Sequence, residues 1–463
     1  MLLKYLLASA TSFFATKTLA DTPAECRYND LVGTWKFHFT KAGQDNSIQC
    51  VGQDRSDQAL FSNSLEVEFS DVNKITRLDT NVEGFFTLIY NQGFEAIINE
   101  RRWFAFFESS LIPYTYQCNL TAVGWVHDNL GDDWACFYGE RISQPETDSN
   151  EIDLPVSVPL TRTIRSESDK PEILKNLSKR SNNQNTANIY HPGHKTSRKN
   201  PRPIKSWKEL ENDVKRAIRT IKKTDQQLSG SLPASFDWND LNMVSPVKNQ
   251  LNCGSCYAFA SVGMFEARAR VQTNNHWQPL FSEQEITSCS DYSQGCRGGF
   301  PYLISKYGQD FGIVDESCYE YNATDRVCKA LDPIACPRWR ISNYGYIGDY
   351  YGGASEYLIR KEVYENGPVA VSLDATDLHS YESGIWYPEA EQDALSWDPF
   401  VFTNHVVLIT GWGWDDETGL PFWNIKNSWG EDFGYDGYFH CMRGVDSIGV
   451  ESLPAKCTMI PPL

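Results

Sequence analysis

The placement of thirteen cysteines constrains the fold of this 463-residue chain more than any other feature. Four cysteines lie between residues 26 and 136, none lies between residues 137 and 252, and nine follow. Most thiols pair in an oxidising compartment, and an odd number leaves at least one unpaired. The pattern predicts two disulfide-bearing units that are separated by a segment without disulfides.

The N-terminal residues predict entry into the secretory pathway. In residues 1–20 the cation Lys4 precedes the apolar stretch 5–14, and the segment ends in the small-residue pattern Thr18-Leu19-Ala20. This arrangement is typical of a secretory signal peptide, and its apolar stretch is too short to cross a bilayer. We therefore expect the mature chain to begin at Asp21.

Charge and hydropathy restrict the partners. The net charge is −18 at pH 7, whereas nucleic-acid binding usually needs a basic face. After the signal, no stretch approaches the roughly 18 apolar residues of a membrane helix. We therefore expect neither nucleic acid nor a membrane as partner. Triplets that can accept glycans in the secretory pathway begin at Asn119, Asn176 and Asn322.

Residues 21–140 are predicted to form an all-β unit. Apolar and polar residues alternate in 35–39 and 65–69, and residues 85–98 resemble a hairpin. Residues 103–107 read as another apolar strand. No stripe with a 3.6-residue period appears, so we expect a barrel or a sandwich. The four cysteines of this unit allow three pairings.

Residues 141–231 differ from both neighbours in composition. Residues 151–231 contain 17 Lys+Arg against 9 Asp+Glu, and only residues 207–221 look helical. A basic segment without cysteines between acidic units that bear them is either an excised pro-segment or an interdomain linker that stays in place.

Residues 232–463 predict an α+β domain. A helix is expected over residues 256–270, with Phe259, Val262, Phe265 and Ala269 near one face. Strands are expected later, at residues 369–373, 406–409, 422–425 and 437–439. Helices followed by strands suggest two halves that face each other across a cleft.

Three short motifs in this domain carry a recognisable chemistry. Cys256 ends the pattern Cys253-Gly-Ser-Cys256 at the start of the predicted helix, His405 lies in Thr-Asn-His-Val-Val, and Asn427 lies in Lys-Asn-Ser-Trp-Gly. A cysteine at a helix N-terminus beside an imidazolium has a pKa well below the free value of about 8.5. Cysteine, histidine and asparagine in this order indicate nucleophilic catalysis by a thiolate.

We assign each residue an expected role. Cys256 attacks a peptide carbonyl, and His405 is its ion-pair partner and protonates the leaving amine. Asn427 orients the imidazole, and Trp429 shields that hydrogen bond from water. Gln250 donates its amide to the developing oxyanion together with the backbone N–H of Cys256.

Each of these residues has a structural alternative when it is taken singly. Cys256 could belong to a disulfide, His405 to the core and Asn427 to a turn, but their joint occurrence in these motifs favours catalysis. A metal site at Cys253 and Cys256 is disfavoured, because no second Cys/His pair with zinc spacing accompanies them. We expect no metal.

Residues 232–463 resemble the papain family of cysteine peptidases over their whole length, through the motifs just described. The N-terminal part resembles the branch of that family that carries a β-rich exclusion domain. The motifs that carry this second resemblance are Asp21-Thr-Pro-Ala24, Leu31-Val-Gly-Thr-Trp35, Ile89-Tyr-Asn-Gln-Gly-Phe-Glu95, Trp103-Phe-Ala-Phe-Phe107 and Gly124-Trp-Val-His-Asp128.

The resemblance implies an architecture. A two-lobed, papain-like catalytic domain at residues 232–463 follows an all-β, barrel-like exclusion domain at residues 21–140. Residues 141–231 are an activation segment that processing proteases excise. A further cut separates a heavy chain of about 232–397 from a light chain of about 398–463. A homotetramer in a lysosome or a similar acidic vesicle is also implied.

The resemblance implies an activity as well, the removal of dipeptides from the free N-termini of peptides and proteins through a thioester. Asp21 pairs with the substrate ammonium, Gly298 and Gly299 pair with extended substrate beside Trp429, and chloride binds near Tyr302 and Tyr346. The alternative is a papain-like endopeptidase whose N-terminal domain is a chaperone or an inhibitor. An inactive binding protein is disfavoured by the intact catalytic motifs.

The disulfides implied by the resemblance are Cys26–Cys118, Cys50–Cys136, Cys253–Cys296, Cys289–Cys328 and Cys318–Cys336. Cys441 and Cys457 fall outside this set. A sixth bond between these two would leave Cys256 as the odd thiol.

Overall fold

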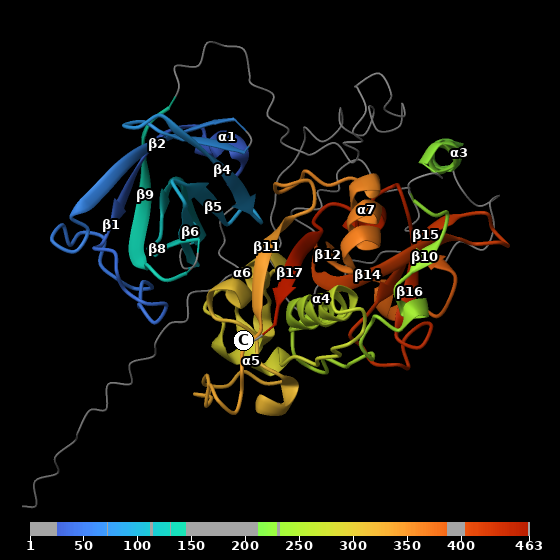
Figure 1. Ribbon diagram of the computed structural model, residues 1–463. Coiled ribbons are helices and arrows are strands. Elements are labelled where there is room, and N and C mark those ends of the chain that lie inside the picture. The colour runs from blue at the N-terminus through green and yellow to red at the C-terminus, as the bar shows by residue number, and fades with distance from the viewer. Residues whose placement is uncertain are drawn as a thin grey trace, which may run out of the picture.

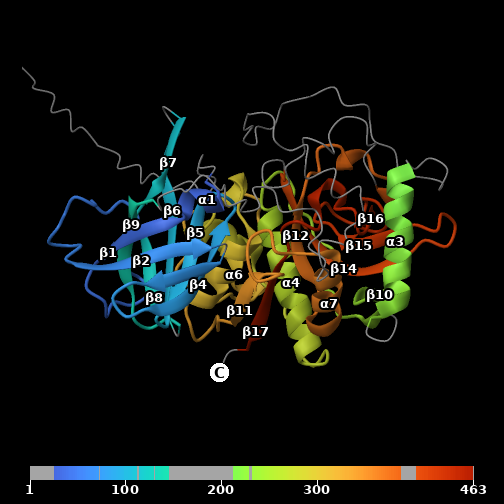
Figure 2. The ribbon, with the colours of Figure 1, turned by 90° about the horizontal axis from the view of Figure 1, so that it is seen from above.

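The structure is a computed structural model of the chain. It describes residues 26–71, 73–111, 114–129, 131–144, 212–228, 232–386 and 403–461. The predicted signal peptide, Asp21, most of the predicted activation segment and the predicted heavy–light cut lie outside the described residues. An all-β domain packs on one side of a larger α+β domain, and helix α3 (Asn212–Leu228) lies on the other side, as Figure 1 and Figure 2 show.

Nine antiparallel strands build the N-terminal domain. They are β1 (Gly33–Phe39), β2 (Asn63–Asp71), β3 (Lys74–Arg77), β4 (Val82–Ile89), β5 (Gly93–Ile98), β6 (Arg101–Leu111), β7 (Tyr114–Thr121), β8 (Gly124–Asp128) and β9 (Ala135–Ser143). Pairing of β1 with β9 closes the sheet into a barrel. The short helix α1 (Tyr28–Leu31) precedes β1 in the chain. Along β1, Trp35 and Phe37 are fully buried while their neighbours are partly exposed, which is the predicted alternation. The all-β prediction is confirmed.

The second domain contains the helices α4 (Cys256–Gln272), α5 (Glu283–Cys289), α6 (Pro301–Asp310) and α7 (Glu356–Asn366). Helix α4 begins where the sequence predicted, but it is buried on all sides from Tyr257 to Arg270 rather than along one face. It contacts the strands β12, β14 and β17 and the helices α5, α6 and α7. A central helix needs no polar face, because every side meets protein.

The sheet of this domain contains β10 (Phe236–Asp237), β11 (Arg340–Tyr346), β12 (Val369–Leu373), β13 (Ile385–Trp386), β14 (His405–Trp414), β15 (Pro421–Lys426), β16 (Tyr438–Met442) and β17 (Ala455–Ile460). Their order is β11-β17-β12-β14-β15-β16-β13, with β10 paired to β14. The α+β prediction for this domain is confirmed. Strands β12, β14 and β15 contain the ranges predicted for them, and β16 begins one residue later than the predicted range 437–439.

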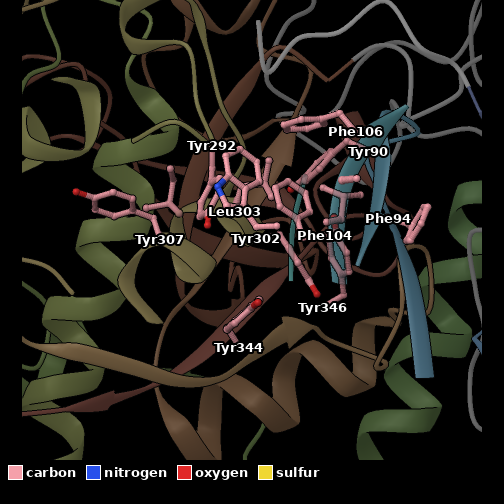
Figure 3. Packing of buried hydrophobic residues seen from close by; sticks show 14 of the residues in the cluster. Tyr90, Phe94, Phe104, Phe106, Tyr292, Tyr302, Leu303, Tyr307, Tyr344 and Tyr346 are labelled. Carbon is pink, nitrogen blue, oxygen red and sulfur yellow. The ribbon is translucent and has the colours of Figure 1, made fainter. Parts of the chain in front are cut away.

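Aromatic rings from both domains form their interface (Figure 3). Tyr90, in the β4–β5 turn, stacks on Phe300 with ring centroids 3.8 Å apart. Phe104 of β6 packs edge-on against Tyr292 at 5.3 Å. Phe300 directly precedes α6, so the β domain contacts the loop that leads into this helix.

All five disulfides implied by the resemblance are present, two in the β domain and three in the α+β domain. The sixth is not. Cys441 and Cys457 are free thiols, buried in different hydrophobic clusters, so Cys256 is one of three free cysteines. Core packing of a small apolar thiol explains both residues without a bond.

Helix α3 and residues 141–144 are the described parts of the predicted activation segment, and β9 extends to Ser143 within it. The helix spans Asn212–Leu228, whereas the sequence predicted residues 207–221. The later end places Asp225 within the helix. None of the helices in the described ranges has the length and apolar character that crossing a membrane requires.

Candidate active site

Cys256 is the first residue of α4, the central helix of the α+β domain. The disulfide Cys253–Cys296 holds the turn before it, and the N–H of Gly254 donates to the carbonyl of Cys296 at 2.9 Å. A Cβ on Gly254 would lie 2.5 Å from that carbonyl oxygen, so the turn requires glycine. The thiol is therefore held at a helix N-terminus, where the dipole favours a negative charge.

Burial works against that charge. It raises the pKa of the Cys256 thiol to about 11, while backbone N–H groups, first that of Val406, act in the other direction. The depressed pKa expected from the sequence is not found for the thiol alone, because the cost of desolvation exceeds the gain from the helix N-terminus. The contact with Val406 puts the thiol beside the first residues of β14.

His405 begins β14 and is buried. Its Nε2 lies 2.8 Å from Oδ1 of Asn427, which follows β15 and also accepts the N–H of Ser428 at 2.8 Å. Burial lowers the pKa of His405 to about 4, and the hydrogen bond to Asn427 opposes this shift. Burial thus disfavours thiolate and imidazolium singly, and only a paired charge compensates both.

Trp429 covers this hydrogen bond from the side. Its ring stacks on His405 with centroids 4.8 Å apart. It also stacks on His379 at 4.2 Å, from the short helix η6 (Leu378–Ser380). No recognisable motif surrounds His379 in the sequence, so nothing local predicts this position.

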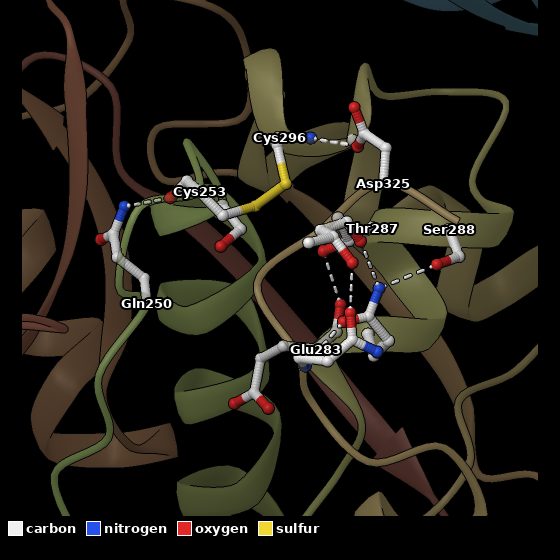
Figure 4. Close-up of a disulfide and its surroundings, with 12 residues drawn as sticks. Gln250, Cys253, Glu283, Thr287, Ser288, Cys296 and Asp325 are labelled. Atoms are coloured by element: carbon white, nitrogen blue, oxygen red, sulfur yellow. Dashed lines mark hydrogen bonds between the residues drawn. A yellow bond between two sulfur atoms is a disulfide. The ribbon is translucent and has the colours of Figure 1, made fainter.

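Gln250 lies next to the catalytic turn (Figure 4). Its Nε2 donates to the carbonyl of Cys253 at 2.9 Å, and its Oε1 accepts the Ser428 hydroxyl at 2.6 Å. A side-chain amide has two N–H donors, so one remains for a ligand. The Ser428 contact links Gln250 to the segment that carries Asn427.

Gly298 and Gly299 lie between the Cys296 disulfide and α6. Gly298 has φ +134°, and a Cβ on Gly299 would lie 2.6 Å from the ring of Tyr257. Glycine is therefore required at both positions by the local fold, and it leaves the backbone open to close approach.

Tyr302 and Tyr346 stack on one another with centroids 4.7 Å apart (Figure 3). The Tyr302 hydroxyl donates to Glu95 of the β domain at 2.6 Å, so its single proton is committed and an adjacent anion would meet a carboxylate. The Tyr346 hydroxyl is buried and has no hydrogen-bond partner of normal geometry in the described residues. The Tyr346 hydroxyl is therefore open to an anion, whereas the Tyr302 hydroxyl is occupied by Glu95.

Asp21, the residue that the resemblance assigns to the substrate ammonium, lies outside the described residues. The described ranges hold no group of three His, Cys, Asp or Glu side chains arranged to bind a metal ion.

A buried charge cluster behind Asn427 was not recognised from the sequence. It surrounds a space of about 20 Å³, about the size of one water. Lys248 Nζ lies 3.2 Å from Glu266 and 2.9 Å from Glu283, and burial lowers the pKa of Lys426 to about 8. These residues come from separate segments, so no local spacing pattern connects them.

Comparison with known proteins matches both domains. The model for papain family cysteine proteases matches residues 232–458, and the cathepsin C exclusion domain matches residues 21–141. Cathepsin C of Schistosoma mansoni is 35% identical over 460 residues, which cover 95% of each chain. Cathepsin Z of Onchocerca volvulus is 32% identical over 224 residues, which cover 45% of this chain and 69% of that protein.

Among solved structures, the digestive procathepsin L2 proteinase from Tenebrio molitor larval midgut shares 35% identity. The match covers 49% of this chain and 68% of that one, with a TM-score of 0.44. The match to cathepsin C covers 95% of the chain, and the two family models match its N-terminal and C-terminal domains separately. The chain therefore belongs to the cathepsin C family of papain-type cysteine proteases.

Proposed function

We propose that this protease removes dipeptides from the free N-termini of peptides and proteins, with Cys256 as its nucleophile. The single observation that carries the proposal is the stacking of Tyr90 on Phe300. This contact brings the β domain against the residue that follows Gly298 and Gly299. A papain-type cleft is open along its length, so a domain at this place limits how much substrate extends beyond the second residue.

The reaction uses the contacts of the site in order. The Cys256 thiolate bonds to the carbonyl carbon of the second substrate residue, and the oxyanion accepts from Gln250 Nε2 and the Cys256 N–H. His405 gives the former thiol proton to the leaving nitrogen, and the C–N bond breaks. His405 then takes a proton from water as the water oxygen bonds to the thioester carbon. The C–S bond breaks, the dipeptide leaves with its new carboxylate, and the Cys256 thiolate and the His405 imidazolium are restored. Asn427 keeps the imidazole oriented throughout.

Recognition of the free amine is assigned to Asp21, the expected first residue of the mature chain. Its carboxylate would pair with the substrate ammonium in a charge-assisted hydrogen bond. Within a closed cleft, such a pair should contribute roughly 1.5–3 kcal/mol. Gly298 and Gly299 are assigned to pairing with the backbone of the extended substrate. Trp429 lies beside the substrate and shields the His405–Asn427 hydrogen bond from water.

The experiment compares Asp21→Asn with the unaltered protein on free and N-acetylated dipeptide substrates. We expect the specificity constant for the free-amine substrate to fall about ten- to a hundredfold, as loss of that pair requires. An acetylated substrate should be cut poorly by both forms. Efficient cleavage of the acetylated substrate by the unaltered protein would instead favour the endopeptidase alternative.

Maturation is part of the proposal. Excision of residues 141–231 and a cut between about 397 and 398 would yield three chains. Each of the five disulfides lies within one of these chains, so the chains would be held together by non-covalent contacts, among them the pairing of β12 with β14 and the interface around Phe300. We further assign the protein to an acidic lysosome-like vesicle as a homotetramer, with chloride at Tyr346. N-terminal sequencing of the mature chains tests the cuts, and halide titration of Tyr346→Phe tests the chloride site.

A further inference from the structure

Helix α3 binds the catalytic domain far from the catalytic residues. It lies at the end of β14 that carries Trp414, whereas His405 begins the same strand (Figure 2). Nine residues of extended strand separate the two ends by roughly 30 Å. The place where α3 binds is therefore not part of the cleft.

A buried carboxylate anchors the helix. Asp225 Oδ1 lies 2.9 Å from Arg360 of α7, and Oδ2 lies 2.9 Å from Arg443, which follows β16. The indole N–H of Trp414 donates to Oδ2 at 3.1 Å. Arg360 and Arg443 are 1% and 0% exposed, so this carboxylate is held in a site built for it rather than on a surface.

The catalytic domain supplies only part of the charge that these arginines need. Glu356 pairs with both of them, at 2.6 Å from Arg360 and closely with Arg443. Two guanidinium groups then face one carboxylate from the domain itself, and Asp225 supplies the second. Removal of one partner of a buried ion pair leaves an uncompensated charge, which is strongly unfavourable.

Apolar contacts extend along the same face of α3. Ile218 is 2% exposed and packs with Leu420, Ile385 and Met442. A Cβ on Gly444 would collide with Cδ1 of Ile221, so glycine at this position makes room for the helix. Ile218, Ile221 and Asp225 follow the i, i+3, i+7 spacing of one helix face.

The outer face of the helix is different. Arg219, Lys222 and Lys223 are exposed. The helix therefore presents one carboxylate and two isoleucines to the catalytic domain, whereas Lys222 and Lys223 lie on its exposed surface. The contacts named above come from one face of the helix.

We propose that the face under α3 is an exosite of the catalytic domain, a binding site for an amphipathic helix that carries a single buried carboxylate. Helix 212–228 is its ligand, and binding does not depend on the covalent link between the two. The inference rests on the proposed function in one respect, because excision of residues 141–231 is what separates the helix from the domain. Occupancy of the exosite leaves the cleft open.

The first experiment uses the full-length protein. Hydrogen exchange is measured for the amides of α3 in the unaltered chain, in Asp225→Ala and in the matched control Lys222→Ala, which changes the exposed face of the same helix. Alanine favours helix at both positions, so the comparison isolates the anchor. We expect exchange of α3 to quicken about a hundredfold in Asp225→Ala and to change little in Lys222→Ala. Equal exchange in all three proteins would overturn the proposal.

The second experiment adds a labelled synthetic peptide of residues 212–228 to the processed enzyme and follows fluorescence anisotropy at neutral pH. We expect saturable binding that the Asp225→Ala substitution in the peptide weakens about a hundredfold and Lys222→Ala leaves unchanged. A saturating peptide should not alter hydrolysis of a dipeptide substrate. Absence of binding, equal binding of all peptides, or competition with substrate would each refute the exosite.

These outcomes are separate from those of the proposed function. An enzyme that releases dipeptides but does not bind the peptide contradicts only the exosite. An enzyme that binds the peptide but cleaves no free-amine substrate contradicts only the proposed activity.

Discussion

Two carboxylates from outside the catalytic domain, Glu95 of the β domain and Asp225 of α3, are buried against it at opposite ends. Glu95 accepts the hydroxyls of Tyr302 and Tyr344 at 2.6 Å each, and it lies 3.5 Å from Lys306 of α6. Asp225 meets two arginines and an indole N–H. Both are buried carboxylates paired with cations and hydrogen-bond donors, but Glu95 is bound by two tyrosines and a lysine, and Asp225 by two arginines and a tryptophan.

The difference lies in what each carboxylate is connected to. Glu95 holds Tyr302, which is three residues beyond Gly299 at the start of α6. Asp225 holds Trp414, at the end of β14 remote from His405. A change at Glu95 should therefore reach substrate binding, whereas a change at Asp225 should affect only the stability of the domain and the retention of α3.

The largest loss of activity is expected from the catalytic pair itself, Cys256 and His405. Cys256→Ala should lower dipeptide release by about 10⁴-fold or more, because nucleophile and base act as one unit. Its melting temperature should stay close to that of the unaltered protein, since neither interface involves the thiol. Residual activity of several per cent, measured with a free-amine substrate on purified protein, would contradict the assignment of Cys256.

The next largest effect is expected at Glu95. Glu95→Ala leaves two buried phenols without their acceptor and removes a counter-charge from Lys306, which should cost about 3–5 kcal/mol of stability. KM for dipeptide substrates should rise as well, because Tyr302 loses its tether. Denaturant unfolding and steady-state kinetics measure the two effects.

Glu66→Ala is the matched control, an exposed glutamate of the same barrel. It should change neither quantity. If Glu95→Ala lowered stability without any change in KM, Glu95 and Asp225 would be equivalent, and the distinction between the two regions would fail.

A smaller effect is expected at Gly444, under α3. Gly444 has φ +82°, a conformation that alanine adopts only with strain, and the Cβ of Gly444→Ala would also collide with Ile221. Together these effects should lower the stability of the full-length protein by about 1–3 kcal/mol. After removal of α3, the collision is gone and only the backbone strain remains. Thermal unfolding before and after processing measures the difference. An equal penalty in both forms would mean that Ile221 does not press on this residue.

The smallest effect is a difference in pH response. Burial raises the pKa of Asp446 to about 7 and that of Glu451 to about 8, just behind the α3 site, where Glu451 accepts the N–H of Gly444. At Glu95, burial raises the pKa, but the charges of Lys306 and Arg102 outweigh it and lower the pKa overall. The two regions therefore respond to pH with opposite signs.

The sign follows from proton binding. Between about pH 4 and pH 8 the folded protein holds protons on Asp446 and Glu451 that the unfolded chain releases, so stability falls as pH rises. Glu95 contributes stability above its unfolded pKa of about 4.3 and loses it only as pH falls further. Melting temperatures from pH 4.5 to 8 should fall less steeply in Glu451→Gln. The exposed Glu365→Gln is the control, and an unchanged slope in Glu451→Gln would contradict the assignment.

Local patterns determined the parts of this protein whose signals lie close together in the chain. The alternation around Trp35 predicted β1, and the Cys253-Gly-Ser-Cys256 turn predicted the start of α4. The family resemblance also implied the five disulfides that the structure contains. The predictions of β1 and of the start of α4 succeed because strands and helix starts are specified by neighbours within a few positions. The disulfides join residues 18 to 92 positions apart and were reached only through the resemblance.

Tertiary structure alone decided what depends on distant segments. It showed that α4 is buried all round, that the Tyr302 hydroxyl is committed to Glu95, and that Cys441 and Cys457 lie in separate clusters without a bond. It also raised the pKa of Cys256 where the helix N-terminus suggested a fall. The physical reason is the same in each case. Burial and pairing are properties of residues that meet only in the fold, so desolvation and long-range hydrogen bonds leave no pattern in the linear sequence.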